Sequence, residues 1–366
     1  MNGGGKLAFN AASAYLAEVY EDKFPIIHKL LTDSSPPETD EEQELYQALV
    51  EGQYLIDENL DELATLKARN RINRFDHKSL LLTIAPTLGC NFKCDYCFES
   101  QRPEKFSDET MAALLKFTEK NLRRSEDMAV TWFGGEPTLC LSIIEKVSGE
   151  FRNIAAKRGA NFQPATIVSN GYILDGKMAE RLKSAGIHGG QLTLDGPERV
   201  HDQRRKLHNG KGTFQKIIQN LAESSGILKW VIRVNVDRDN HESAFEVIEV
   251  LDKEKILGNV YVYFAQVNSS EGVCGDMLGR CLSTEEFSVD QVKLYKKLIE
   301  NGFYQIEYPS LAPGGHCGAD TENSYVVTPD GKLYKCWEEL TLKDDRSVGS
   351  LFDENPTPVQ RANRTK

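Results

Sequence analysis

The pattern of apolar and polar positions changes near residue 80. From there to residue 266, short apolar runs alternate with stretches whose apolar residues recur at helical spacing. Such runs are typical of strands buried on both faces, and helices between them indicate parallel strands joined by right-handed crossovers. The predicted strands are residues 80–86, 128–133, 165–169, 190–194, 228–236 and 259–266. Six units are too few for a closed eight-stranded barrel, so we expect an α/β fold with an open, partial (β/α)6 barrel.

Two predicted helices of this region carry clear start signals. Ser107 is the expected N-cap of a helix over residues 107–124, which has acidic residues in its first turn and arginines at its end. Ser283 and Glu286 have the spacing of a capping box at the start of a later helix.

Residues 1–75 follow a different pattern. It predicts a strand at 6–10, helices at 24–31, 41–50 and 58–69, and a short strand or wing at 53–56. The Ser-Ser-Pro-Pro stretch at 34–37 separates the first two helices. This order of elements resembles a degenerate winged helix, and the alternative is a helical lid or dimerisation segment.

Composition narrows the classes of function. The 366-residue chain has a formal net charge of −11, which argues against non-specific nucleic-acid binding. No apolar run approaches the roughly 18 residues of a membrane span, and the first residues lack the apolar core of a signal peptide. Eight cysteines without an export signal indicate reduced thiols and metal ligation in the cytoplasm rather than disulfides.

Three cysteines follow the first strand of the repeating region. Cys90, Cys94 and Cys97 have the spacing C-x3-C-x2-C. Closely spaced thiolates suit zinc or an iron–sulfur cluster. A structural zinc site normally closes with four protein ligands, whereas three thiolates on a four-iron cluster leave one iron open. The ligand count therefore favours a cluster, with a zinc loop as the alternative.

Later strand ends carry polar motifs, and active sites of parallel α/β sheets form at this edge. A Gly-Gly-Glu motif follows the second strand, a Ser-Asn-Gly motif closes the third, and an Asp-Gly followed by His-Asp-x-x-Arg comes after the fourth. Each motif alone would be an ordinary turn or a charged loop. The residues concerned are Gly134, Gly135, Glu136, Ser169, Asn170, Gln191, Asp195 and Arg205.

In this order, the motifs resemble those of radical S-adenosylmethionine (SAM) enzymes, over residues 80–265. The resemblance implies a [4Fe–4S] cluster on the three cysteines and SAM at its open iron. It implies that Glu136 binds the SAM amino group, Ser169 the ribose and Arg205 the SAM carboxylate. Further residues implied at the cofactors or substrate are Tyr96, Phe98, Gly134, Gly135, Asn170, Gln191 and Asp195.

The resemblance also implies the chemistry. The cluster would pass one electron to SAM and release a 5′-deoxyadenosyl radical, which abstracts a hydrogen atom from an unactivated C–H bond. An electron donor such as a flavodoxin or ferredoxin is then expected. The motifs identify no general base.

The C-terminal region, residues 306–366, holds a second pair of cysteines. Cys317 and Cys336 flank two β-rich runs joined by a Pro-Asp-Gly turn. This spacing resembles the first half of the auxiliary-cluster domain called SPASM, or twitch when short, but the later cysteines of the full pattern are absent. Cys281 is a further candidate ligand, and Cys274 is another.

By the order of their elements, residues 1–75 resemble the peptide-recognition elements fused to radical SAM enzymes that modify ribosomal peptides. Residues 76–305 resemble a radical SAM partial barrel, and 306–366 an incomplete auxiliary-cluster domain. We expect a maturase of a ribosomally made, possibly Cys-rich, precursor peptide, which installs a thioether or carbon–carbon cross-link. The enzymatic alternative is an anaerobic sulfatase-maturating type. A non-catalytic iron–sulfur or zinc peptide-binding protein would not need the Gly-Gly-Glu motif or Arg205.

Overall fold

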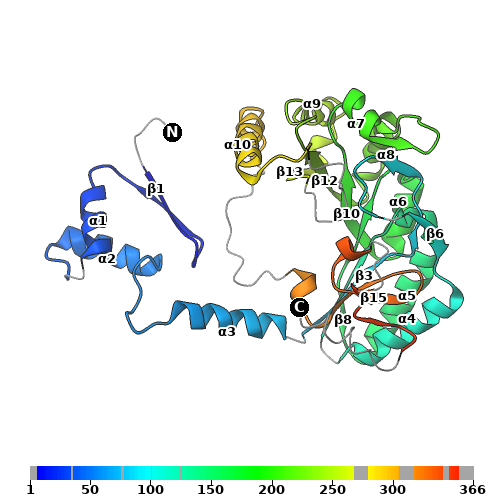
Figure 1. Ribbon diagram of the computed structural model, residues 1–366, viewed down its shortest axis with the longest axis horizontal. Helices are drawn as coiled ribbons and strands as arrows, with labels where there is room; N and C mark the ends of the chain where they lie inside the picture. The colour runs from blue at the N-terminus through cyan, green and yellow to red at the C-terminus, as the bar shows by residue number, and fades with distance from the viewer. Residues whose placement is uncertain are drawn as a thin grey trace. The chain divides into compact units, whose positions relative to one another are not determined.

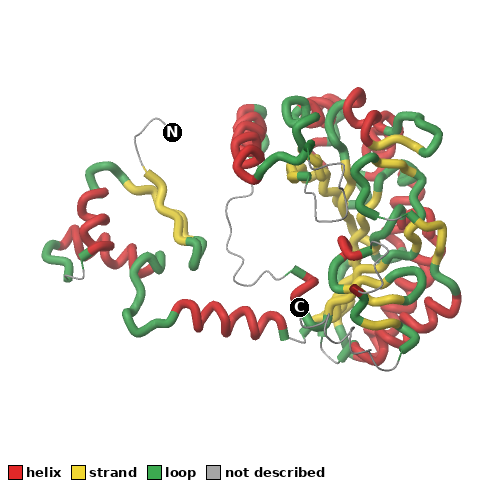
Figure 2. Tube along the Cα trace, in the orientation of Figure 1, coloured by secondary structure: helices red, strands yellow, loops and turns green. Residues whose placement is uncertain are grey.

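A computed structural model describes residues 6–33, 36–75, 78–99, 101–123, 126–267, 279–304, 317–340 and 346–353. The chain divides into two compact units (Figures 1 and 2). The first, called the N-terminal unit below, is Met1–Phe75 with Glu307–Cys317. The second, the barrel unit, is Asp76–Ile306 with Gly318–Lys366.

The barrel unit is organised around one ten-stranded sheet, in the order β13-β12-β10-β9-β7-β3-β14-β15-β16, with β8 (Asn161–Phe162) beside β7. The six predicted strands are all present and pair in parallel with their neighbours. They are β3 (Ser79–Ile84), β7 (Asp127–Trp132), β9 (Ala165–Ser169), β10 (Ile187–Thr193), β12 (Lys229–Val236) and β13 (Val260–Gln266). The prediction of an α/β fold with a parallel sheet is confirmed.

Helices follow the strands and cover one face of this sheet (Figure 1). The predicted N-cap of α4 is present, and so is the capping box of α10, although α4 ends three residues earlier than expected. The helices are α4 (Asp108–Asn121), α5 (Leu141–Arg158), α6 (Gly176–Ser184), α7 (Glu198–Arg204), α8 (Phe214–Ser224), α9 (Glu246–Lys253) and α10 (Thr284–Glu300).

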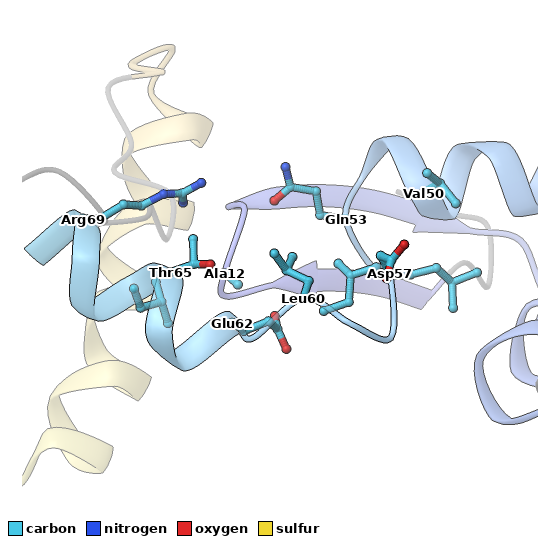
Figure 3. Close-up of a pocket in the computed structure, with 11 residues that line it drawn as sticks. Ala12, Val50, Gln53, Asp57, Leu60, Glu62, Thr65 and Arg69 are labelled. Atoms are coloured by element: carbon cyan, nitrogen blue, oxygen red, sulfur yellow. The ribbon is translucent and has the colours of Figure 1, made fainter.

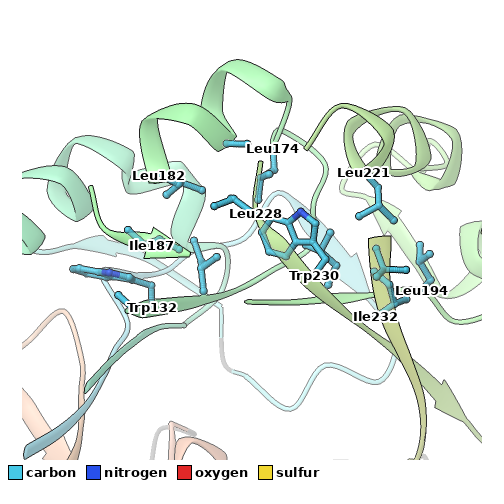
Figure 4. Packing of buried hydrophobic residues seen from close by; sticks show 14 of the residues in the cluster. Trp132, Leu174, Leu182, Ile187, Leu194, Leu221, Leu228, Trp230 and Ile232 are labelled. Carbon is cyan, nitrogen blue, oxygen red and sulfur yellow. The ribbon is translucent and has the colours of Figure 1, made fainter. Parts of the chain in front are cut away.

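The main core lies between the sheet and these helices. Trp132 on β7 and Trp230 on β12 are almost fully buried, and Figure 4 shows both among leucine and isoleucine side chains from strands and helices. The Trp230 indole N–H donates to Ser224 Oγ at 3.0 Å, which satisfies its one polar atom. Alternate residues of each strand point into this core, and the residues between them point to the opposite face of the sheet, where they are available for a binding site.

The C-terminal strands extend the same sheet. β14 (Ser324–Val327) pairs in parallel with β3, and β15 (Lys332–Tyr334) returns antiparallel to it. β16 (Gly349–Ser350) then pairs with β15. The turn between β14 and β15 contains Gly331 at φ +77°, a conformation that suits glycine.

The N-terminal unit contains a two-stranded antiparallel sheet, β1 (Lys6–Asn10) with β2 (Tyr15–Val19), and the helices α1 (Phe24–Thr32), α2 (Asp40–Glu51) and α3 (Glu62–Arg74). The strand β2 was not predicted. Apolar and polar residues alternate little along β2, because both faces of this strand are largely exposed.

The predicted wing at 53–56 is wrong. Gln53 has φ +57°, so the chain turns there instead of extending. Tyr54 anchors this turn, because its ring meets Tyr15 edge-on and its hydroxyl lies 2.7 Å from the Ala8 carbonyl oxygen. The helix predicted from residue 58 begins only at Glu62, where Asp61 caps it by accepting from the Ala64 N–H.

No helix in the described part of the chain is long and apolar enough to cross a membrane.

Candidate active site at the carboxyl ends of the strands

The cysteine motif lies on the segment that leaves β3. Cys90 and Cys94 are half-buried and Cys97 is exposed. The short strand β5 (Phe92–Cys94) pairs antiparallel with β11 (Arg205–Leu207), which places Arg205 directly opposite Cys94. The cysteine segment is therefore held by residues more than a hundred positions away along the chain.

The glycines of the Gly-Gly-Glu motif allow two loops to touch. A Cβ on Gly134 would lie 2.4 Å from the Thr87 carbonyl oxygen, and one on Gly135 would lie 2.4 Å from that of Gly89. The backbone N–H of Gly135 donates to Thr87 at 3.2 Å, and that of Glu136 donates to Gly89 at 2.9 Å. These glycines thus hold the segment that leads into the cysteines against the end of β7.

The Glu136 carboxylate is an internal brace. It is fully buried, and Oε1 accepts from the Thr138 backbone N–H and hydroxyl and from Ser169 Oγ. Oε2 accepts from the Asn170 backbone N–H at 2.7 Å. The last two of these hydrogen bonds join the ends of β7 and β9, so the predicted site residues Ser169 and Asn170 both meet Glu136.

Asn170 also reaches the cysteines. Its Nδ2 donates to Asn91 Oδ1 at 2.7 Å and lies 3.7 Å from Cys90 Sγ. The Phe92 backbone N–H lies 3.4 Å from the same sulfur. Donors aimed at a sulfur stabilise its thiolate form, which is the form that binds metals.

Arg205 is buried beside Cys94 with part of its guanidinium free. Its Nη1 donates to the Tyr96 hydroxyl oxygen at 2.7 Å, and its charge lies over the Phe92 ring. Its Nε is buried and has no hydrogen-bond partner among the residues that the structure describes. Buried donors are normally paired, so this N–H can take an anionic group such as a carboxylate.

Asp195 is occupied by a neighbouring arginine. Arg204 Nε donates to Asp195 at 3.2 Å, and Arg204 Nη1 donates to both oxygens of Asp237 at 2.9 Å. Both carboxylates are fully buried. The sequence analysis missed Arg204 and Asp237, although Asp237 follows the end of β12 as the other motifs follow theirs.

A polar wall continues across the last strands. Gln191 on β10 accepts from the Tyr263 hydroxyl of β13 at 2.7 Å. Arg233 donates to Asn235 on β12, and Asn235 Nδ2 lies 3.2 Å from the Tyr96 hydroxyl oxygen.

A second apolar cluster lies beside the cysteine segment. Phe98 packs with residues that follow β3 and β7 and with the C-terminal strands. Trp337, which directly follows Cys336, stacks on Phe133 with ring centroids 5.5 Å apart. Phe133 in turn precedes Gly134, so the chain around Cys336 lies close to the Gly-Gly-Glu motif.

The predicted auxiliary ligands are less clearly grouped. Cys281 and Cys336 are half-buried, and Cys317 is exposed and falls with the N-terminal unit. Cys274 lies outside the described residues. Among the residues that are described, no three Cys, His, Asp or Glu side chains converge on the position of a single metal ion.

The donor set fits a cluster with an anionic ligand at its side. Burial raises the pKa of the Cys90 thiol to about 12, with the charge of Glu136 adding to it. Metal binding reverses this tendency, because bound cysteines are thiolates. Three soft ligands, donors near Cys90 and a free guanidinium N–H near Cys94 suit a [4Fe–4S] cluster with SAM.

Glu99 is a further residue that the sequence analysis missed. It follows Cys97 by two positions, its Oε2 is buried, and that atom has no hydrogen-bond partner in the described structure. Burial, with the charge of Glu136, raises the pKa of its carboxyl to about 8. The signal that could have identified it is its position directly after the cysteine motif.

Comparison with known proteins agrees with this geometry. Residues 84–251 match the model of the radical SAM superfamily. The chain is 27% identical to an Fe-coproporphyrin III synthase of Methanosarcina barkeri over 59% of its own length, and it spans about half (52%) of that protein. It is 23% identical to the radical SAM cyclopropyl synthase TigE of Paramaledivibacter caminithermalis, over 90% of this chain and 75% of TigE.

Two further similarities are to a sulfatase-maturating enzyme and to a protein solved with a precursor peptide. A serine-type anaerobic sulfatase-maturating enzyme of Bacteroides thetaiotaomicron is 27% identical over 78% of this chain and 76% of that protein. Streptococcus suis SuiB bound to its precursor peptide SuiA matches in fold with a TM-score of 0.57, at 13% identity, over 98% of this chain and 87% of SuiB.

The match, the strand-end motifs and the cysteine segment agree on the same region of the barrel unit. Radical SAM proteins use a [4Fe–4S] cluster and SAM, and the homologues found here are enzymes. Residues 84–251 therefore match the radical SAM superfamily, and the chain is similar in sequence to a sulfatase-maturating enzyme and in fold to SuiB.

Proposed function

We propose that this protein is a radical SAM maturase that binds the leader of a ribosomally made precursor peptide through its N-terminal unit and installs a cross-link in the peptide. The observation that carries the proposal is the apolar surface of that unit. Of the exposed large hydrophobic side chains in the described residues, two thirds lie between Leu7 and Phe75. Patches of this kind mark binding surfaces.

The N-terminal unit offers two features that suit a peptide. Within the described residues, β1 and β2 pair only with each other, so each has an unpaired edge that an extended peptide can join. A pocket of about 290 Å³ lies beside α3, with Leu55, Ile56, Leu60 and Leu66 among its apolar lining. Figure 3 shows Glu62, Thr65 and Arg69 on its α3 side and Val50 at the end of α2.

Charge adds a preference to this surface. Residues 1–75 contain 14 acidic and seven basic side chains, so about two thirds of the net charge of −11 lies in one fifth of the chain. A leader with apolar side chains flanked by lysine or arginine would be attracted to this unit and steered toward the pocket.

In the barrel unit, we assign a role to each of the following site residues. Cys90, Cys94 and Cys97 would hold the cluster, and the free Nε–H of Arg205 would hold the SAM carboxylate. Glu136 ties the ends of β7 and β9 together. When bound, the cluster and SAM supply a 5′-deoxyadenosyl radical, which removes a hydrogen atom from the peptide. A cytoplasmic flavodoxin or ferredoxin would supply the electron.

The proposed cross-link is a thioether between a cysteine sulfur and a carbon of the peptide. One C–H and one S–H bond break and one C–S bond forms. The C–H hydrogen leaves as an atom to the deoxyadenosyl group, the thiol proton leaves to a base, and one electron must leave the product. An auxiliary iron–sulfur cluster is the expected acceptor of that electron. We propose Cys281 and Cys336 of the barrel unit as two of its ligands.

The test uses the full chain, reconstituted anaerobically with iron and sulfide, with SAM, a reductant and a precursor peptide encoded beside its gene. We expect SAM-dependent loss of two hydrogen atoms from the peptide and one cysteine fewer that alkylating reagents can label. If the two hydrogen atoms are lost while every thiol still reacts, the cross-link is a carbon–carbon bond rather than a thioether. No change in any such peptide would overturn the maturase proposal.

The second candidate is formylglycine formation of the sulfatase-maturating type. The similarity to the Bacteroides enzyme over 78% of this chain favours it. An aldehyde in a Cys- or Ser-containing sulfatase peptide, detected by a hydrazide probe, would support this candidate. We place this candidate second because formylglycine formation gives no role to the apolar surface of the N-terminal unit.

A further inference from the structure

Arg233 on β12 is a half-buried cation on the face of the sheet that bears the site. Its neighbours Ile232 and Val234 are buried in the main core, so Arg233 points to the opposite face. It forms no ion pair within the described part of the chain, and no residue of β10, β12 or β13 is acidic. Arg238, by contrast, pairs with a glutamate through both of its terminal nitrogens.

Two contacts fix the direction of the Arg233 guanidinium. Its Nε donates to Asn235 Oδ1 at 2.7 Å, toward the carboxyl end of β12. The ring of Tyr263, its register partner on β13, has its centroid 5.9 Å from the guanidinium carbon. The 2.7 Å hydrogen bond from the Tyr263 hydroxyl to Gln191 spans β12, because this strand lies between β13 and β10. Gln191 is in register with Val231, so the bond crosses on the amino-terminal side of Arg233. The guanidinium is therefore held toward the strand ends.

Donors remain available at this position. The terminal nitrogens Nη1 and Nη2 of Arg233 meet no acceptor among the described residues, and neither do the amide N–H groups of Gln191. A partly buried charge without a partner is costly, which favours an anionic ligand. Two N–H groups of a guanidinium match the two oxygens of a carboxylate, so a carboxylate is the anion that this geometry suits.

A chain of hydrogen bonds connects Arg233 to the cofactor site. Asn235, which accepts from Arg233, has its Nδ2 3.2 Å from the Tyr96 hydroxyl oxygen. The same oxygen accepts from Arg205 Nη1 at 2.7 Å. The two guanidinium groups thus lie at the two ends of one short polar chain. If Arg205 holds the carboxylate of SAM, an anion on Arg233 lies beside SAM, where the substrate must be.

We propose that Arg233 binds a carboxylate of the peptide substrate and holds it near the residue that loses its hydrogen atom. This inference rests on the proposed maturase function. The carboxylate belongs either to an acidic side chain of the modified segment or to the C-terminus of the peptide. The substrate is then a peptide whose leader suits the acidic N-terminal unit and whose modified segment presents a negative charge to the barrel unit.

The experiment measures kcat/KM for the precursor peptide of the function test, with anaerobically reconstituted wild type and Arg233→Gln. We expect Arg233→Gln to lower kcat/KM by about tenfold or more, because a hydrogen bond between charged groups is lost. Arg233→Lys keeps the charge without the planar fork and should recover part of this loss. Lys229→Gln is the matched control, since it removes one charge from the exposed start of the same strand, and it should leave kcat/KM unchanged.

Altered peptides identify the carboxylate. Each acidic residue of the peptide is changed in turn to its amide, and one further peptide has an amidated C-terminus. One of these peptides should lose about the same factor with wild type and little more with Arg233→Gln, because both changes remove the same contact. If Arg233→Gln loads less iron than wild type, Arg233→Lys takes its place in this comparison.

Three results would overturn the inference and leave the maturase function intact. The first is an unchanged kcat/KM in Arg233→Gln, and the second is a set of losses that multiply for every altered peptide. The third is weaker binding of S-adenosylhomocysteine by the same factor as the loss in kcat/KM, because the guanidinium would then serve the cofactor. A wild-type protein that modifies no such peptide would overturn the maturase function, and the inference with it.

Discussion

The two units differ in how far their apolar side chains are buried. In the barrel unit, large side chains such as Trp132, Ile144 and Phe151 are completely buried between sheet and helices. In the N-terminal unit, the described residues include only three buried hydrophobic side chains, Val19, Leu30 and Leu49. The barrel unit can stabilise itself, whereas the N-terminal unit retains apolar surface that a partner can cover. Chemistry and recognition are thereby assigned to different parts of the chain.

The largest expected effect separates these two tasks. Cys94→Ser removes one of three thiolates, and we expect loss of the cluster and of SAM cleavage down to the level of protein without iron. Iron counting and the yield of 5′-deoxyadenosine measure this loss.

Leader binding by the same variant should remain within twofold of wild type, because Cys94 belongs to the barrel unit. If leader binding disappears together with the cluster, the division of tasks between the two units is wrong. Cys140→Ser is a useful control, since this buried cysteine lies outside the cluster motif.

A pair of stability measurements tests the difference in burial. Trp230→Ala empties a fully packed position in the barrel unit and should lower the free energy of unfolding by about 3–5 kcal/mol. Leu63→Ala, at a position that is 60% exposed on α3, should change it by less than about 0.5 kcal/mol. Urea denaturation followed by tryptophan fluorescence and circular dichroism gives both values.

A large effect of Leu63→Ala would mean that Leu63 is covered in solution, and the N-terminal unit would then have no free apolar surface at this position. The contrast in burial between the two units would then not hold for the N-terminal unit.

The same contrast explains how much of the fold could be predicted. The six parallel strands were recognisable because each is a compact apolar run, and helical spacing between the runs fixed the crossovers. The strand β2 was missed, and the turn at Gln53 was mistaken for a wing, because neither has a buried face to impose a period. Sequence patterns report burial, so they are weakest where little is buried.

The site was predictable in its location and less so in its contacts. The cysteines and the Gly-Gly-Glu motif are local signals. The pairing of β11 with β5 decides whether Arg204 or Arg205 faces the cysteines. The ion pair of Arg204 with Asp237 joins residues 33 positions apart in the chain, so it depends on tertiary packing. The saturated carboxylate of Glu136 and the unpaired one of Glu99 arise from the same long-range packing.

A smaller effect is expected at the peptide-binding surface. Leu60, just before α3, lines the pocket of the N-terminal unit, and Leu63, three residues later on α3, is not among its lining residues. Leu60→Asp should weaken binding of a fluorescent synthetic leader by about tenfold, as expected for an apolar contact in a binding pocket. Leu63→Asp is the matched control and should have little effect.

SAM cleavage without peptide should be the same in both of these variants and in wild type. Equal weakening of leader binding by the two substitutions would place the leader elsewhere on the unit, for example along the edge of the β1–β2 sheet.

The last prediction concerns a buried histidine of the barrel unit. His201 is fully buried, its Nδ1 accepts from the Asp195 N–H at 3.3 Å, and its Nε2 donates to Thr213 Oγ1 at 3.1 Å. Thr213 has its own proton committed to the Arg205 carbonyl oxygen, which fixes the neutral tautomer of His201. Burial, with the charges of Arg205 and Arg204 and against that of Asp195, lowers the pKa of His201 to about 3.

Because the pKa of His201 in the folded state lies below its ordinary value of 6.5, the unfolded state binds the extra proton first. The stability that neutral His201 contributes is complete above pH 6.5 and is lost as pH falls toward 3, by up to about 1.4 kcal/mol per pH unit. We expect His201→Gln to reduce the slope of unfolding free energy against pH between pH 6 and 4 by about this amount. His28→Gln, at an exposed position of the N-terminal unit, should leave the slope unchanged. Equal slopes in His201→Gln and wild type would mean that water reaches this imidazole, and the barrel core would then be less closed at this point than the contrast between the units requires.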